Sequence, residues 1–252
     1  MPKDLPRTAA LAATALFLLY PLWGLASPVG RWRWAAAGAG PALATSFALT
    51  GVALVIVVAV GTPLAFFLRG AARGVRIAFE AAVLLSVLMP PLALGLLLAL
   101  AFGPGTAVGE LLLRLGVPAS NDPAAFVVTQ VYASLGYYLL GAAAAFEAVP
   151  RTLEQSAALL GLRPRAVLWR VTLPLARLGL AAAVSLAWVR ALGEFGAIMV
   201  TAYYPHGIPV QLWVDLQDSG LPAVLPLLLV FLLSALPLPW ALRILARSRG
   251  YA

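Results

Sequence analysis

Six stretches of the chain, each close to twenty residues or longer, are dominated by Ala, Leu, Val, Ile, Phe and Gly. A bilayer core about 30 Å thick requires roughly 20 apolar residues in one helical span, so stretches of this length favour transmembrane helices. We place the spans at residues 8–26, 43–68, 78–101, 124–148, 176–201 and 220–242. The sequence therefore predicts an all-α integral membrane protein with about six transmembrane helices.

The composition supports the same class. Hydrophobic residues make up 63% of the 252 residues and charged residues only 10%, which is more apolar surface than a water-soluble core of this size can bury. The surplus must face lipid. The connections between the spans are short, so we expect residues 1–252 to form a single transmembrane domain with no attached soluble domain.

The formal net charge of +8 is unevenly distributed along the chain. Basic residues gather before the first span, after the second, around residues 151–177 and at the carboxyl terminus, whereas the opposite loops contain Arg31, Arg33 and Arg114 beside four acidic residues. Because Lys and Arg are enriched in cytoplasmic loops, this pattern predicts that both termini and residues 151–177 are cytoplasmic. Topology thus accounts for the charge, and we expect no nucleic-acid partner.

The first apolar segment has an alternative interpretation. A basic start precedes it and the small residues of "GLAS" follow it, as in a cleaved signal peptide. Cleavage would leave five spans and an external amino terminus, which the remaining charges support less well. We therefore expect residues 8–26 to be a retained span.

The stretch "LEQSAALLGLRPRAVLWRVTLP" at residues 153–174 interrupts the apolar sequence between the fourth and fifth spans. Good helix formers from Arg151 to Leu160 precede a stop at Gly161, and Pro164 suits the first turn of a second short helix that ends near Pro174. Two brief helices of this kind are too polar to insert and too short to form a domain. They predict a docking surface for another protein, against the alternative of an ordinary interfacial loop.

This stretch resembles the coupling loop, or EAA loop, of permease subunits in binding-protein-dependent ABC importers. In that family Glu-Ala-Ala, three residues and Gly are followed nine residues later by an aliphatic residue, any residue, Leu and Pro. The Glu position is Gln here and one Ala position is Ser, and Glu154 stands one place earlier to offer a carboxylate. Within residues 150–174, the resemblance implies that the residues which couple to an ATPase are Glu154, Gln155, Ser156, Ala157, Gly161, Val171, Leu173 and Pro174.

The resemblance extends from about residue 43 onward. "SFALTGVALVIVVAVGTPLAFFLRG" looks like the second span of the family, "LMPPLALG" like its third, and "VRALGEFGAIMVTAYYP" like its fifth with the following loop. The segment "RALGEFGA" is most similar to sulfate, molybdate and tungstate permeases, and "YYP" to molybdate/tungstate members. The resemblance implies a methionine-importer-like fold and import of a tetrahedral oxyanion, most closely molybdate or tungstate, with sulfate, thiosulfate or another small solute as the alternative.

The resemblance also implies the partners. They are a second copy of the permease, two ATP-binding cassette subunits and a periplasmic or lipid-anchored substrate-binding protein, all at the cell inner membrane. A phosphate-binding P-loop needs a Lys after its glycines, and the only lysine of this chain is Lys3. We therefore expect a non-catalytic subunit that binds no cofactor or metal, with ATP-Mg bound by the partner subunit.

Two pairs of residues inside the spans are candidates for the translocation pathway or its gate, together with Gly193. Arg190 and Glu194 lie four residues apart on one face of the predicted fifth helix, where each unpaired charge would cost roughly 2.5–3.5 kcal/mol at the bilayer centre. They either line the pathway or lock helices together. Pro90 and Pro91 remove backbone donors within the third span, which predicts a kink that lines the pathway or a structural bend.

Two other classes of membrane protein fit the sequence less well. An intramembrane hydrolase requires a nucleophile and a base inside the bilayer, and the chain has one histidine and no cysteine. A secondary transporter requires ion-coupling carboxylates near the midplane, and only Glu194 qualifies.

Overall fold

The computed structural model describes residues 5–26, 38–118 and 120–248, and within these ranges it contains helices and no strand. The prediction of an all-α protein is confirmed. Along the chain the helices are α1 (Leu5–Leu19), η1 (Tyr20–Ala26), α2 (Ala39–Leu68), α3 (Arg73–Leu88), α4 (Pro91–Phe102), α5 (Ala107–Arg114) and α6 (Pro123–Glu147). They continue with α7 (Arg151–Leu159), α8 (Pro164–Val167), η2 (Leu168–Thr172), α9 (Leu173–Leu192), α10 (Gly196–Thr201), α11 (Ile208–Ser219), α12 (Leu221–Ala235) and α13 (Pro237–Ser248).

Five segments among the described residues are long and apolar enough to cross a bilayer, and a bent pair of helices makes a sixth. The single segments are Thr8–Leu25, Ala39–Leu68, Pro123–Glu147, Pro164–Leu192 and Leu221–Leu245, and the pair is Arg73–Leu88 with Pro91–Phe102. The expected number of spans is confirmed with the bent pair counted as one.

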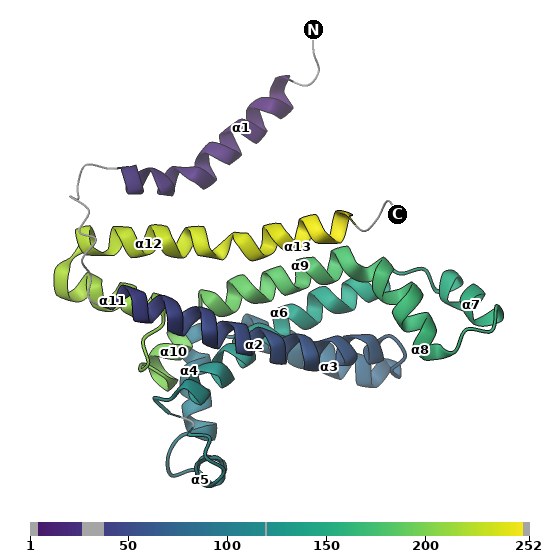
Figure 1. The fold of residues 1–252 in the computed structure, drawn as a ribbon, viewed down its shortest axis with the longest axis horizontal. Helices are drawn as coiled ribbons and strands as arrows, with labels where there is room; N and C mark the ends of the chain where they lie inside the picture. The colour runs from purple at the N-terminus through teal and green to yellow at the C-terminus, as the bar shows by residue number, and fades with distance from the viewer. Residues whose placement is uncertain (1–4, 27–37, 119, 249–252) are drawn as a thin grey trace.

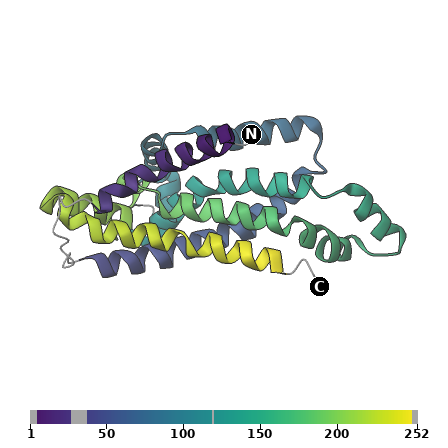
Figure 2. The ribbon, with the colours of Figure 1, turned by 90° about the horizontal axis from the view of Figure 1, so that it is seen from above.

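The centre of the bundle is an antiparallel pair, α6 and α9, which α2 joins on one side (Figures 1 and 2). Small residues let the two backbones approach closely. A Cβ atom placed on Gly141 would lie 2.8 Å from Cβ of Ala183, and one on Gly179 would lie 2.5 Å from Cβ of Ala145. Each helix thus contributes a Gly and an Ala four residues apart, the small-residue spacing that favours close helix packing in membranes.

Two predicted spans are not continuous helices. The third predicted span, 78–101, is broken between Leu88 and Pro91, where the helix axis turns by 112°. The fifth, 176–201, ends as α9 at Leu192 and resumes as the separate helix α10. The predicted kink at Pro90–Pro91 is confirmed as a break. A continuous fifth span was the wrong interpretation, because apolar composition reports the length of a segment and not its internal breaks.

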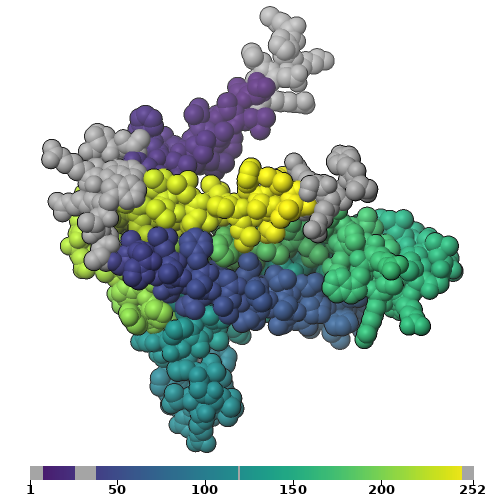
Figure 3. All heavy atoms as spheres, in the orientation of Figure 1, coloured from purple at the N-terminus to yellow at the C-terminus, as the bar shows by residue number. Residues whose placement is uncertain are grey.

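The two ends of the bundle differ. At one end α7 and α8 project beyond the other helices, and α13 ends on the same side (Figure 1). At the opposite end lie α10 and α11. The helices α4 and α5 form a limb that leaves the bundle sideways, and α1 stands apart from it, with none of its membrane-spanning window buried (Figures 1 and 3).

Some residues of the charge pattern lie outside the described ranges. These are both chain ends and the loop that contains Arg31 and Arg33. The predicted orientation of the bundle in the membrane, and the retention of the first span, stay predictions.

Candidate functional site

The first candidate site is the elbow, which we define as residues 150–172. Helix α7 begins after Pro150 and ends at Leu159, and the chain then turns at Gly161, which has a φ of +86°. The amide of Leu162 donates to the carbonyl of Ala157 (3.2 Å) and that of Gly161 to the carbonyl of Ala158 (2.9 Å). These two bonds form a Schellman motif, in which glycine takes the left-handed position. The predicted helix stop at Gly161 is confirmed.

The second arm of the elbow differs from the prediction. It does not end near Pro174, because α8 continues through the π-turn η2 directly into α9, and Pro164–Leu192 forms one span. A proline inside a helix lacks the amide hydrogen and crowds the preceding turn. The wider turn at Leu168–Thr172 lies immediately before Pro174 and accommodates it. The part of the elbow from Pro164 to Thr172 is therefore a continuous helical extension of α9.

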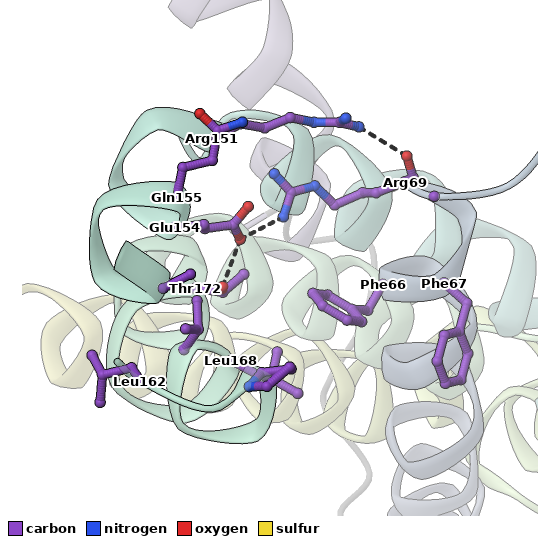
Figure 4. A pocket seen from close by; sticks show the side chains of 13 residues that line it. Phe66, Phe67, Arg69, Arg151, Glu154, Gln155, Leu162, Leu168 and Thr172 are labelled. Atoms are coloured by element: carbon purple, nitrogen blue, oxygen red, sulfur yellow. Dashed lines mark hydrogen bonds and ion pairs between the residues drawn. The ribbon is translucent and has the colours of Figure 1, made fainter. Parts of the chain in front are cut away.

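A hydrogen-bonded cluster joins the elbow to α2. Glu154 Oε1 accepts from Arg69 Nη1 (2.8 Å) and from Thr172 Oγ1 (2.6 Å), as Figure 4 shows. Arg69 also donates from Nη2 to the carbonyl of Val149 (3.2 Å), and Arg151 Nη2 donates to the carbonyl of Arg69 (2.9 Å). The carboxylate of Glu154 thus points into the protein.

The environment of Glu154 has opposing effects on its pKa. Burial disfavours the ionised form and acts to raise the pKa, but hydrogen bonds from Arg69 and Thr172 and the charges of Arg69 and Arg151 outweigh it. The net result is a lowered pKa. Glu154 is therefore ionised at neutral pH.

A groove of about 550 Å³ separates the end of α2 from the elbow. Its walls are largely apolar, with Phe66 and Phe67 on one side and Leu162 and Leu168 on the other (Figure 4). Arg69, Arg151 and Glu154 lie at one side of this groove and supply its polar groups.

The remaining predicted coupling residues are spread over the surface and the interior of the elbow and the first two residues of α9. Gln155, Ser156, Gly161 and Pro174 are exposed, Val171 and Leu173 are half-buried, and Ala157 is buried. Sequence reasoning missed the most exposed apolar pair, Leu159 and Leu160, which are 88% and 85% exposed at the tip of the elbow. Their position next to the glycine turn was the available signal.

The second candidate site lies where the broken third and fifth spans meet. Pro90 is extended, and Pro91 begins α4. A Cβ on Gly196 would lie 2.8 Å from Cβ of Pro91, and one on Gly95 would lie 2.8 Å from Cα of Ala197. The beginnings of α4 and α10 are thus in direct contact, and the structure brings the predicted Pro90–Pro91 and Arg190–Glu194 pairs to one region.

The Arg190–Glu194 pair exists, although its two residues do not share a helix face. Helix α9 ends at Leu192, and Glu194 follows the exposed Gly193 in the break. Glu194 is 0% exposed; its Oε1 accepts from the amide of Ala197 (2.8 Å), which caps α10, and its Oε2 accepts from Arg190 Nη1. Arg190 is 19% exposed, and its guanidinium lies 5.5 Å from the centre of the Tyr137 ring. The pair neutralises two charges that would each be costly within a membrane span if unpaired.

Sequence reasoning missed a glutamine whose side chain bonds to the backbone at the break after Leu192. Gln130 of α6 donates from Nε2 to the carbonyl of Ala191 (2.9 Å) and to Thr50 Oγ1 of α2 (2.9 Å). A broken helix in a bilayer leaves backbone groups that only the protein can satisfy. Gln130 therefore donates a hydrogen bond to a backbone carbonyl at the end of α9, and Glu194 accepts one from a backbone amide at the beginning of α10.

The described residues contain no group of three or more His, Cys, Asp or Glu side chains placed to hold a metal ion.

Comparison with known proteins identifies the family. Residues 58–251 match the family model described as "Binding-protein-dependent transport system inner membrane component". The chain belongs to this family. It is 40% identical over 176 residues to a probable molybdenum ABC transporter permease protein of Haloferax volcanii, a match that covers 69% of this chain and 64% of that protein, just under two thirds of its length. It is 34% identical over 241 residues to the molybdenum transport system permease protein ModB of Mycobacterium tuberculosis, with 91% of both chains covered.

Solved structures share the fold. A chain in the crystal structure of a bacterial ABC transporter involved in the import of the acidic polysaccharide alginate aligns with a TM-score of 0.75 at 18% identity, over 99% of this chain and 97% of that chain. A chain of the methionine ABC transporter MetNI aligns with a TM-score of 0.61 at 17% identity, over 84% of this chain and 94% of that chain. At these identities the likeness establishes the fold alone, and it confirms the expected methionine-importer-like architecture.

Proposed function

We propose that this chain is the membrane permease subunit of an ABC importer for a tetrahedral oxyanion, with molybdate or tungstate as the substrate. The observation that carries the proposal is the 34% identity to a molybdenum transport system permease over 91% of both chains. A match of that extent includes the elbow, both broken spans and the connections between them.

In this proposal the elbow docks on a separate ATP-binding subunit. The docking surface comprises the exposed residues Gln155, Ser156 and Gly161 with the apolar tip Leu159–Leu160. ATP-Mg is bound by that subunit, so this chain transports without catalysing a reaction. Closure of two ATP-binding subunits would displace two elbows, and the continuous helix from Pro164 would convey the displacement into the membrane.

The assembly follows from the same proposal. It contains two copies of this permease, two ATP-binding subunits and a substrate-binding protein on the opposite face. The protein then lies in the inner membrane of the cell, with the elbow and both termini on the cytoplasmic side. The basic residues at the elbow end support this orientation, since Lys and Arg favour the cytoplasmic side.

The contact between the two broken spans is the proposed translocation pathway. Helix breaks within a bilayer are tolerated where backbone lines a cavity or is buried in protein. Pro90, Pro91 and Gly193 supply the breaks, and Arg190 supplies a partly exposed cation for a dianion that Glu194 alone would repel.

The test is transport by the reconstituted complex. The permease is purified with its ATP-binding subunit and placed in liposomes, and uptake of molybdate, tungstate and sulfate is measured with the cognate binding protein and internal ATP. We expect ATP-dependent uptake of molybdate or tungstate, which Gly161→Asp or a bulky residue at Ala157 should uncouple from hydrolysis. Uptake by the permease alone, or of sulfate only, would contradict the proposal.

A further inference from the structure

Three elements meet at one carboxylate on the inner side of the elbow. Glu154 belongs to α7, Arg69 follows the last residue of α2, and Thr172 lies in the π-turn that leads into α9. Both donors bond to the same oxygen, Glu154 Oε1, at 2.8 Å and 2.6 Å. One atom therefore connects the docking helix to two separate spans.

The cluster is largely buried at one side of the groove. The side chain of Arg69 is 9% exposed, that of Glu154 is 20% exposed, and Thr172 is buried. A partner that took the carboxylate would have to displace Arg69, whose second nitrogen is bonded to the carbonyl of Val149. The residues that follow Glu154 along α7, Gln155 and Ser156, are exposed and remain free for docking.

The polar connection between the elbow and α2 runs through this cluster, in addition to the packing of α2 against α6 and α9. The chain itself connects α7 backward to α6 through Val149 and Pro150, and forward through α8 to α9. No covalent route of comparable length reaches α2, which ends at Leu68. Hydrogen bonds to ionised groups are the stronger ones in proteins, so the Arg69–Glu154 contact and the Arg151 bond to the carbonyl of Arg69 hold α2 to the elbow.

We propose that Glu154 is a positioning residue which acts through Arg69 and Thr172, so that displacement of the elbow moves α2 together with α9. The inference rests on the proposed role of the elbow in coupling. It assigns Glu154 a function distinct from docking, which the adjoining exposed residues perform. Loss of the cluster should leave the ATP-binding subunit attached while less of its motion reaches the membrane.

The experiment compares isosteric variants in the complete transporter. Glu154→Gln removes the charge, and Thr172→Val removes the hydroxyl. Thr172→Ser keeps the hydroxyl and serves as the conservative variant at the same position. Two quantities are measured: the affinity of the permease for its ATP-binding subunit, and the number of ATP molecules hydrolysed for each anion imported. We expect unchanged affinity and a roughly tenfold rise in ATP hydrolysed per anion for Glu154→Gln, since a bond to a charged group contributes about this factor to an equilibrium. Thr172→Val should show a smaller rise, and Thr172→Ser should return to the wild-type ratio.

The matched control is Glu80→Gln, which alters a carboxylate that pairs with Arg76 outside the elbow. Normal coupling in Glu154→Gln, or loss of affinity for the ATP-binding subunit in parallel with coupling, would overturn the inference. If Glu154→Gln fails to assemble, the two Thr172 variants decide, because both keep the ion pair. Equal ratios of ATP hydrolysed per anion in Thr172→Val and Thr172→Ser would then refute the positioning role of Glu154. Failure of the wild-type complex to import any oxyanion would instead refute the proposed function.

Discussion

The close packing of α6 against α9 predicts the effect of a single methyl group. In Gly179→Ala the new Cβ would lie 2.5 Å from Cβ of Ala145 and 3.0 Å from its Cα. Carbon atoms pack best at about 3.5–4.0 Å, so the two helices would have to separate by about 1 Å at this point. The contacted atoms belong to the helix core and cannot swing aside.

The expected magnitude combines two terms of opposite sign. Overpacking of this kind costs about 1–3 kcal/mol, whereas Ala in place of Gly within a helix gains about 1 kcal/mol. Gly51→Ala in α2 provides the control, because a Cβ there would meet nothing within 4 Å. The propensity gain is common to both variants, so the free energies of unfolding should differ by about 1–3 kcal/mol in favour of Gly51→Ala.

The assay is reversible unfolding of the purified protein in mixed micelles with increasing SDS, followed by helical circular dichroism. A compensating variant sharpens it: Ala145→Gly combined with Gly179→Ala moves the methyl group to the other helix and should recover most of the lost stability. Equal stability of Gly179→Ala and Gly51→Ala would show that α6 and α9 do not approach as described, and the packing account would fail.

Two further predictions concern the charged residues. Glu194→Leu leaves Arg190 without its carboxylate and the amide of Ala197 uncapped, and since breaking a buried pair costs about 3–5 kcal/mol, thermal unfolding should occur well below the wild-type temperature; an unchanged midpoint would contradict the burial of the pair. The folded pKa of Glu154 is lowered from 4.5, so its contribution to stability is complete above about pH 4.5 and is lost as the pH falls through the lowered pKa. Because Glu154 is already ionised there, the difference in melting temperature between wild type and Glu154→Gln should be constant from roughly pH 5 to 7. The difference should shrink at lower pH. A difference that does not change with pH would refute the role of the charge.

Sequence patterns predicted the spans better than their interruptions. Runs of apolar residues placed α2 and α6 within a few residues of their ends, because bilayer thickness sets helix length. The Pro90–Pro91 pair indicated a disturbance, but its size depends on α10, which packs against Pro91. The break after Leu192 carried no such signal, since neither Gly193 nor Glu194 rules out a helix. The break is stabilised by side chains that bond to its two ends: Gln130 bonds to the carbonyl of Ala191, and Glu194 accepts from the amide of Ala197.

At the elbow, local signals were read correctly and distant ones were not. The glycine turn at Gly161 follows from the preference of a left-handed cap for glycine. The partner of Glu154 could not be inferred, because Arg69 is 85 residues away in sequence. Pro174 suggested a helix boundary, and only the π-turn before it explains why the helix continues.

The π-turn at Leu168–Thr172 also fixes the direction in which the elbow points. Such a turn contains one residue more than the α-helix needs, and each residue of an α-helix rotates the chain by about 100°. If the same residues wound as a regular α-helix, the extra residue would swing α7 about a third of a revolution around the axis of α9. The azimuth of the elbow is thus set by the winding of one turn, so even a substitution that preserves every apolar side chain of the span but abolishes the π-turn would aim α7 away from its partner.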